Sequence, residues 1–182
     1  GNGADSDPNG DPLSVNTTPI SGPSNGGLTL NTNGTFTYTP GANFAGSDSF
    51  VYQLSDGVNT DTATVTINVS AVNDPPIARN DSGSGQEDNQ ITGNVLADNG
   101  NGADSDIDGG GLTTSVVTGP QNGSLQLASN GDYTYTPNAN HNGSDSFVYR
   151  LSDGLGGTDT ATVSLTISAV NDAPTAVDDQ FS

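Results

Sequence analysis

The chain has no cysteine, methionine, tryptophan or lysine among its 182 residues. Without cysteine it can form no disulfide, thiolate metal site or thiol nucleophile. Without lysine, a Lys–Asn isopeptide cross-link is excluded as well. Two arginines, Arg79 and Arg150, stand against 21 acidic residues. Nucleic acid is therefore not an expected partner, because binding a polyanion needs a basic surface that this chain cannot build.

Apolar content is low and negative charge is high. Hydrophobic residues make up 30% of the chain and aromatic residues 5%, so any core must be small. No apolar run approaches the ~20 residues that cross a bilayer, which predicts no membrane insertion. A formal net charge of −19 repels itself in a compact state. Divalent cations are the simplest way to neutralise it.

The sequence contains two copies of one pattern. The segment NGTFTYTPGANFAGSDSFVYQLSDG at 33–57 recurs as NGDYTYTPNANHNGSDSFVYRLSDG at 130–154, and VNDPP at 72–76 recurs as VNDAP at 170–174. The repeat length is close to 98 residues. A repeat of this size is typical of a β-sandwich domain and too long for one turn of a solenoid.

The two copies are unequal. Residues 76–100 form a leader in the second copy that the first copy lacks, and residues 173–182 begin a third such leader. We expect a truncated sandwich at 1–72, a linker at 73–76, a complete sandwich at 77–170, and a linker with the start of a third repeat at 171–182. Missing strands leave an open sheet edge. Either the chain is a fragment whose missing strands lie in a longer parent, or a neighbouring chain supplies a strand.

Period-2 alternation of β-branched and aromatic residues with polar ones predicts the strands, for example around Phe50 and Tyr52 or Val163 and Leu165. Asn-Gly and Asp-Gly pairs between the runs suit the positive φ of tight turns. No stretch has helical periodicity. The prediction is all-β, with tandem Greek-key sandwiches of roughly seven strands, the first lacking its N-terminal strand or strands.

If strands alternate in direction through the second copy, each loop can be assigned to one end of the domain. The linker at Asn73 and Asp74, the loop 104–111 and the turn at Asp153 are expected at the N-terminal pole. Glu87, Asp88, the loop 141–145 and the exit linker at Asn171 and Asp172 are expected at the opposite pole. Acidic residues therefore gather at the two poles.

The strongest chemical motif is an acidic loop present in both copies. It reads Asp5-x-Asp7-x-Asn9-Gly10-Asp11 in the first copy and Asp104-x-Asp106-x-Asp108-Gly109 in the second. Carboxylates two residues apart on a curving loop, with a glycine for the turn, resemble the start of an EF-hand calcium loop. The twelfth position is Asn16 or Ser115 instead of glutamate, so the loop is no EF-hand.

The missing ligands must come from elsewhere, and Asp74 and Asp153 are placed to supply them. Oxygen ligands without histidine or cysteine favour Ca²⁺ over a transition metal. The competing interpretation is that Asp, Asn and Gly only make good turns.

The full pattern resembles the cadherin-like, Ig-like tandem repeats of giant RTX-type bacterial surface adhesins. The resemblance rests on the VNDAP linker, NVLADN, the DSDxDG loop, NGDYTYTP and NGSDSFVYRLSDG. It implies a β-sandwich, export to the cell surface, and rigidity from Ca²⁺ at domain junctions. Asn73-Asp74 and Asn171-Asp172 look like the cadherin linker, Asp104 and Asp106 match its acidic pair, and Glu87 occupies the position of a pole-facing glutamate.

No residue set suggests catalysis. His141 is the single histidine and is expected to pack on a loop, and the paired Asp178 and Asp179 lie in the partial third repeat. Arg150 is expected to point outward, and Tyr52 and Tyr149 to lie in the cores. The predicted role is a Ca²⁺-binding extracellular extender that contacts neighbouring repeats. The alternatives are a module binding glycans or other copies of itself, and a filament subunit whose tail, Ala173–Ser182, completes the first repeat of the next chain.

Overall fold

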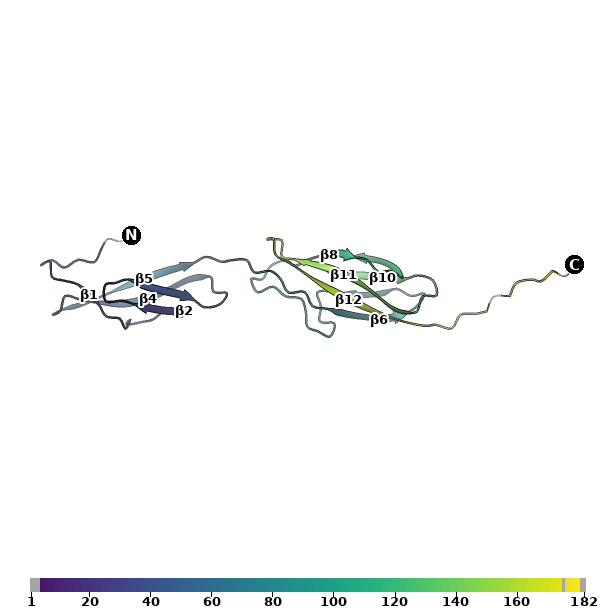
Figure 1. Ribbon diagram of the computed structural model, residues 1–182, viewed down its shortest axis with the longest axis horizontal. Helices are drawn as coiled ribbons and strands as arrows, with labels where there is room; N and C mark the ends of the chain where they lie inside the picture. Colours follow the sequence, from purple (N-terminus) through teal and green to yellow (C-terminus); the bar gives the residue numbers. More distant parts are fainter. Residues whose placement is uncertain (1–3, 175, 181–182) are drawn as a thin grey trace. The chain divides into compact units, whose positions relative to one another are not determined.

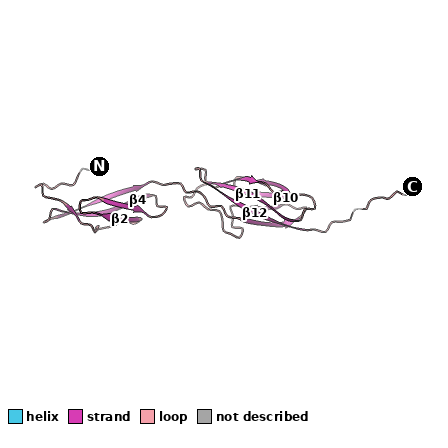
Figure 2. Cartoon of the chain, in the orientation of Figure 1, coloured by secondary structure: helices cyan, strands magenta, loops and turns pink. Residues whose placement is uncertain are grey.

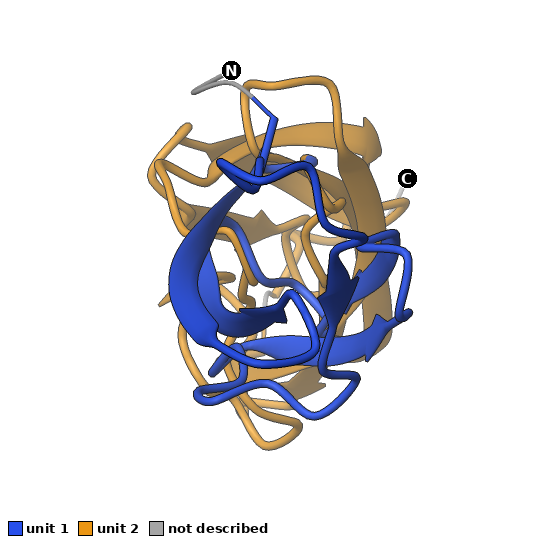
Figure 3. Cartoon of the chain, turned by 90° about the vertical axis from the view of Figure 1, so that its left-hand side faces the viewer, with its two compact units in different colours: residues 1–72 blue, residues 73–182 orange. Residues whose placement is uncertain are grey.

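The computed structural model describes residues 4–174 and 176–180. The chain divides into two compact units, Gly1–Val72 and Asn73–Ser182 (Figure 3). The described residues form strands and irregular connections, with no α-helix among them (Figure 2). The all-β class predicted from the period-2 pattern is confirmed.

In unit 1, residues 4–72 form five strands in two sheets, one with the order β1-β4-β5 and one formed by β2 and β3. The strands are β1 (Ser14–Val15), β2 (Gly26–Leu30), β3 (Phe36–Pro40), β4 (Gly46–Ser55) and β5 (Thr60–Val69). Gly34 and Gly57, which follow Asn33 and Asp56, have φ values of 81° and 96°. The tight turns predicted at these dipeptides are therefore present.

The described part of unit 2 forms seven strands, the number that the sequence predicts for a complete repeat, in sheets of order β7-β10-β9 and β6-β12-β11-β8 (Figure 1). The strands are β6 (Asp81–Gln86), β7 (Ile91–Asn94), β8 (Thr113–Thr118), β9 (Gly123–Leu127), β10 (Asp132–Pro137), β11 (Gly143–Ser152) and β12 (Thr158–Ser168).

The leader of unit 2 supplies its first two strands. β7 pairs antiparallel with β10, and β6 pairs parallel with β12 in a register that runs from Asp81↔Val163 to Gln86↔Ser168. Strict alternation of direction along the chain produces this parallel pair, because the first and seventh strands then run the same way. Residues 4–72 contain no counterpart of β6 or β7, so β5 and β3 each keep a free edge.

The core of unit 2 lies between its two sheets and is closed. Its largest side chains have at most 5% exposure, and Tyr133 packs edge-to-face on Phe147 with ring centroids 5.3 Å apart. The buried set is Ile91, Val95, Tyr133, Tyr135, Phe147, Tyr149, Leu151, Ala161, Val163, Leu165 and Ile167. Alternation in β11 and β12 directs these residues inward while their neighbours face solvent, as predicted.

The core of unit 1 is open. Only Val15, Leu30 and Phe50 are buried among the hydrophobic residues that the structure describes there. Tyr52, predicted as a core residue, is half-buried, whereas its counterpart Tyr149 is fully buried. The physical reason is that residues 4–72 include no counterpart of β6 and β7, which cover the equivalent surface in unit 2.

Candidate metal centre

The linker is held against the N-terminal pole of unit 2. Asn73 Nδ2 donates to Asp153 Oδ2 (2.7 Å), and the backbone N–H of Asp74 donates to Asp108 Oδ2 (2.6 Å). Further along, Ile77 and Ser105 form an isolated antiparallel bridge. The linker, the acidic loop and the turn after β11 therefore meet at one pole, as strand alternation predicts.

Asp104, the first acid of the loop, is an interior hydrogen-bond acceptor. It is 9% exposed; its Oδ1 accepts from the backbone N–H of Arg79 (2.7 Å) and its Oδ2 from the Tyr149 hydroxyl (2.8 Å). Burial raises the pKa of this carboxyl, although the two hydrogen bonds oppose the rise. Asp104 therefore anchors the loop to the core, a structural role in addition to the metal-binding role that its spacing suggests.

Asp106 and Asp108 shape the loop itself. Asp106 Oδ1 accepts from the Asp108 N–H (2.8 Å), and the N–H of Gly109, whose φ is 73°, donates to the Asp106 carbonyl (3.3 Å). The second oxygen, Asp106 Oδ2, is buried and accepts no hydrogen bond from the described residues. A buried carboxylate oxygen without a donor is costly, so this atom is a point where a cation would be favourable.

Asp153 closes the turn between β11 and β12. Its Oδ1 accepts from the backbone N–H groups of Leu155, Gly156 and Gly157, at 2.7–3.0 Å. The hydrogen bond from Asn73 and those from the turn hold the pKa of Asp153 below its ordinary value, against the effect of burial. Asp153 thus ties the linker to the turn through one carboxylate.

The acids of this pole are near one another but are not assembled as a cluster. Within residues 4–174 and 176–180, no group of three or more Asp, Glu or His side chains is arranged to hold a metal ion. The carboxylates of Asp104 and Asp153 are instead engaged by backbone and side-chain donors. Asp106 Oδ2 is left without a hydrogen bond from the described residues, and the backbone of Asp74 lies against the Asp108 carboxylate.

Unit 1 repeats the same loop with fewer contacts. Asp5 Oδ2 accepts from the Tyr52 hydroxyl (2.7 Å), matching the pairing of Asp104 with Tyr149. Asp7 Oδ1 accepts from the N–H groups of Asn9 (2.7 Å) and Asp11 (3.1 Å). Asp5 is exposed, unlike Asp104, because residues 4–72 supply no segment like the linker to cover it.

Glu87 lies at the opposite pole of unit 2, in the turn between β6 and β7, and is 3% exposed. Its Oε1 accepts from the backbone N–H of Val170 (2.6 Å) and its Oε2 from Asn142 Nδ2 (3.2 Å). Glu87 therefore fixes the start of the exit linker. Asn171 and Asp172 follow Val170, are exposed, and bond to each other through Asn171 Nδ2 and the Asp172 carbonyl (3.4 Å).

Two acids that sequence reasoning missed have clear structural roles. Asp145 accepts hydrogen bonds from the backbone N–H groups of Gln121 and Asn122 and from the Tyr135 hydroxyl (2.9 Å). Asp48 makes the equivalent contacts in unit 1, including one from the Tyr38 hydroxyl (2.9 Å). Burial raises the pKa of both carboxyls, but the hydrogen bonds outweigh it and leave the pKa below normal. The sequence did contain a signal for this contact: in both copies the tyrosine of a TYTP segment is followed by the aspartate of an SDSF segment.

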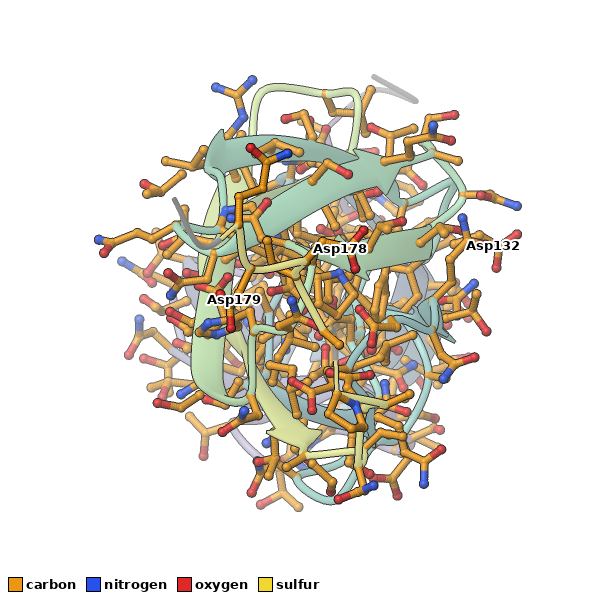
Figure 4. All side chains as sticks on the ribbon, turned by 90° about the vertical axis from the view of Figure 1, so that its right-hand side faces the viewer. Asp132, Asp178 and Asp179 are labelled. Atoms are coloured by element: carbon orange, nitrogen blue, oxygen red, sulfur yellow. The ribbon has the colours of Figure 1, made fainter. Side chains whose placement is uncertain are left out.

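The remaining sequence expectations concern single residues. Arg150 is exposed and Tyr149 is buried, as predicted. His141 is half-buried on the loop before β11, and its Nε2 is a buried atom without a hydrogen bond from the described residues. Asp178 and Asp179 lie exposed on the C-terminal segment (Figure 4). The described residues include no helix long and apolar enough to cross a membrane.

Comparison with solved structures finds similar two-repeat proteins. The EC1-2 fragment of human protocadherin-24 matches with a TM-score of 0.58 and 16% identity, over 92% of this chain and 85% of that one. The EC1-2 fragment of human mucin-like protocadherin matches with a TM-score of 0.55 and 16% identity, over 90% and 86%. At this identity the likeness shows the fold alone.

An endo-fucoidan hydrolase from glycoside hydrolase family 107 is 25% identical, with a TM-score of 0.43 over 90% of this chain. The match spans only 24% of the hydrolase chain. A comparison with curated proteins finds no match. A family model described as a bacterial Ig domain matches residues 2–68 and again residues 73–166. The chain therefore belongs to the bacterial Ig domain family, with two copies of the domain in tandem.

Proposed function

We propose that this chain is a Ca²⁺-binding extender of a bacterial surface adhesin, in which the metal stiffens the connection between consecutive repeats. The role is structural and adhesive, without catalysis. The observation that carries the proposal is Asp106 Oδ2, a carboxylate oxygen that is buried at the pole of unit 2 without a hydrogen-bond donor from the described residues.

The surrounding atoms are of the right chemical type. Ca²⁺ takes six to eight oxygen ligands, which include carboxylates, backbone carbonyls and Asn side-chain carbonyls. Asp106 and Asp108 would hold the ion from the loop, and Asp74 would hold it from the linker, whose backbone already bonds to Asp108. The Asp74 carboxylate would have to turn toward the two loop carboxylates, and carbonyl and amide oxygens would complete the shell.

Such a site would act on the linker. Asn73 and Asp74 follow directly on Val72, the last residue of unit 1. The linker is fixed to unit 2 by two hydrogen bonds, from Asn73 to Asp153 and from Asp74 to Asp108. An ion shared by linker and loop adds a constraint beyond these two hydrogen bonds, one of which is part-buried and the other exposed. Restricting these residues is what a tandem array needs in order to extend without folding back on itself.

The composition supports an extracellular, calcium-rich setting. A chain with net charge −19 and no lysine gains stability when divalent cations bind its folded form. The tandem bacterial Ig domains fit the extender of a long surface protein, as in RTX-type adhesins. Neighbouring repeats of the same protein are then its principal partners.

The test is thermal unfolding of residues 1–182 with EGTA and with Ca²⁺ added stepwise. We expect a saturable rise in Tm, because a ligand at a hundred times its Kd stabilises the folded state by about 2.7 kcal/mol. Asp106→Asn keeps the size of the side chain and the hydrogen bond from Asp108, and should remove most of the rise. Mg²⁺ should give a smaller effect, since it prefers a tighter octahedral shell.

Asp132→Asn is the matched control. It removes the same charge from an exposed position at the start of β10 (Figure 4), so its calcium response should equal that of the parent. Asp104→Ala is unsuitable as the primary variant, because loss of its bond to Tyr149 would destabilise unit 2 without metal. An unchanged Tm in millimolar Ca²⁺ would reject the proposal.

A further inference from the structure

A polar hollow lies beside the outer face of the larger sheet of unit 2. It has a volume of about 470 Å³, the size of a small-molecule site, and opens where β8 ends. β8 pairs with residues 148–152 of β11, so residues 143–147 of β11 have no neighbour on that side. The chain crosses from β8 to β9 through residues 119–122, which line one side of the hollow.

The floor of the hollow is a square of hydroxyl groups. Ser144 is paired with Thr166, and Ser146 with Ser164, across β11 and β12. All four side chains are exposed, because the buried residues that alternate with them, such as Leu165, face the core. Paired side chains lie roughly 5 Å apart across the strands, and the two pairs roughly 7 Å apart along them. A monosaccharide ring, with hydroxyls on most of its carbons, covers a square of this size.

Asp145 holds the wall of the hollow against its floor. Its Oδ1 accepts from the backbone N–H groups of Gln121 (3.0 Å) and Ser146 (2.8 Å). Its Oδ2 accepts from the backbone N–H of Asn122 (2.8 Å) and from the Tyr135 hydroxyl (2.9 Å). The backbone of the crossing segment is therefore fixed. A ligand does not have to order this segment first, which lowers the cost of binding.

The polar side chains around the hollow are available to a ligand. Within residues 4–174 and 176–180, these hydroxyls and side-chain amides make no hydrogen bond with another part of the chain. Each hydroxyl and each amide can both donate and accept. They therefore match a ligand that itself presents hydroxyls. The set is Gln121, Asn122, Ser144, Ser146, Ser164 and Thr166.

The charge of the hollow selects against ionic ligands. Asp145 is the one charged residue among the described residues that line it. Burial raises the pKa of Asp145, but the hydrogen bonds outweigh it and keep the carboxyl ionised at neutral pH. An anionic ligand would meet this carboxylate without a basic side chain in the lining. A cationic ligand would find both carboxylate oxygens already occupied by donors.

An added peptide strand is a poor fit as well, because the N–H of Ser146 already donates to Asp145. We propose that this hollow is a binding site for neutral carbohydrate, with the floor hydroxyls and the amides of Gln121 and Asn122 as its hydrogen-bonding groups. The site is separate from the candidate metal centre, since Asp153 follows the opposite end of β11. Failure of the proposed Ca²⁺ site would therefore leave this proposal untouched.

Unit 1 repeats the arrangement. Asp48 accepts from the backbone N–H groups of Ser24, Asn25 and Ser49, as Asp145 does from their counterparts. The floor pairs are Ser47 with Asn68 and Ser49 with Thr66. Only the amide of Gln121 is lost, because Ser24 takes its place. Each repeat thus carries one site, and a polysaccharide that reaches both would bind more tightly than a short oligosaccharide.

The test is an NMR titration of the isotope-labelled full chain with four neutral oligosaccharides: maltohexaose, cellohexaose, laminarihexaose and mannohexaose. We expect at least one to shift the amide signals of Gly119, Gln121 and Ser146 in a saturable way. Thr166→Ala should weaken that binding about three- to tenfold, the loss expected for one hydrogen bond. Gln121→Ala should have a similar effect.

Thr160→Ala is the matched control. It makes the same change on the same strand, at an exposed position outside the hollow, so affinity should stay that of the parent. Thr166 and Gln121 are exposed too, so none of the three changes threatens folding. Hexagalacturonate, a charged oligosaccharide of the same length, should not bind.

Three results would overturn the proposal. The first is that no neutral oligosaccharide shifts these signals even at tens of millimolar. The second is a sugar that binds the parent, Thr166→Ala and Gln121→Ala alike, or that shifts signals elsewhere in the chain. The third is binding by hexagalacturonate alone, which would assign the hollow to an anionic ligand.

Discussion

The hydroxyl of Tyr149 donates to the carboxylate of Asp104 at 2.8 Å, deep in unit 2. The same pair recurs in unit 1, where Tyr52 donates to Asp5 at 2.7 Å. Both pairs join the middle of a core strand to the first acid of the DSD loop. The loop that carries the candidate metal ligands is therefore positioned by the sandwich core, with or without an ion.

Tyr149→Phe should destabilise unit 2 by about 1–3 kcal/mol, because it leaves the buried Asp104 carboxylate short of a donor. Tyr52→Phe is the matched variant in unit 1. It should cost less than about 1 kcal/mol, since Asp5 is exposed and water replaces the lost hydroxyl. Urea unfolding of the two variants measures both effects. Equal losses would mean that burial of the carboxylate does not determine the cost.

Protonation of the buried Asp81 carboxyl should make unit 2 more stable in mild acid than it is at neutral pH. It is 4% exposed, its Oδ2 lacks a hydrogen bond from the described residues, and burial raises its pKa to about 6 from an ordinary 3.8. The nearby Asp104 carboxylate adds to this rise. Since the folded state binds the proton more tightly than the unfolded state, stability increases as pH falls from about 6 towards 4.

The variant Asp81→Asn tests this. It keeps an acceptor for Asn99, whose Nδ2 donates to Asp81 Oδ1 (3.2 Å). At pH 7 it should be more stable than the parent, by at most about 3 kcal/mol, and the difference should vanish near pH 4. Subtracting the two unfolding curves at each pH removes the acid sensitivity of other carboxyls, such as Asp145. A constant difference between pH 4 and 7 would contradict the prediction.

Gly157 should tolerate no larger side chain. A Cβ there would lie 2.8 Å from Pro75 Cα in the linker and would collide with the Asp153 carboxylate. Gly157→Ala should therefore destabilise unit 2 by about 1–3 kcal/mol and loosen the linker, which hydrogen exchange at Asp74 would report. Gly119→Ala is the control, because a Cβ at that position meets no atom within 4 Å. Similar stability of the two variants would show that the linker yields without cost.

Much of the fold could be predicted because the alternation is clean. In β11 and β12, residues such as Phe147 and Val163 alternate with polar ones, and Asn-Gly and Asp-Gly pairs mark the turns. Alternation of strand direction then placed Asn73 and Asp153 at the same pole. Alternation also gives β6 and β12 the same direction, but the sequence did not show that they are neighbours in one sheet, because the β6 sequence, DSGSGQ, has no hydrophobic residue to mark the strand.

The candidate site could be located but not resolved into roles. The spacing of the motif predicts Asp104 and Asp106 equally as metal ligands and does not distinguish their roles. Their environments differ: Asp104 is satisfied by Arg79 and Tyr149, and Asp106 keeps an unpaired oxygen. The roles of Asp48 and Asp145 depend on loops brought close in space by the fold, and a short motif does not reveal such contacts.

The parallel pairing of β6 with β12 determines how unit 2 responds to a pull on its two ends. Tension at Asn73 and at Asn171 draws these neighbouring strands past each other along their length. All six residue pairs from Asp81↔Val163 to Gln86↔Ser168 are then loaded together in shear, instead of opening one after another like a zipper. Rupture requires their simultaneous failure, so we expect the complete repeat to resist tension applied between its two ends.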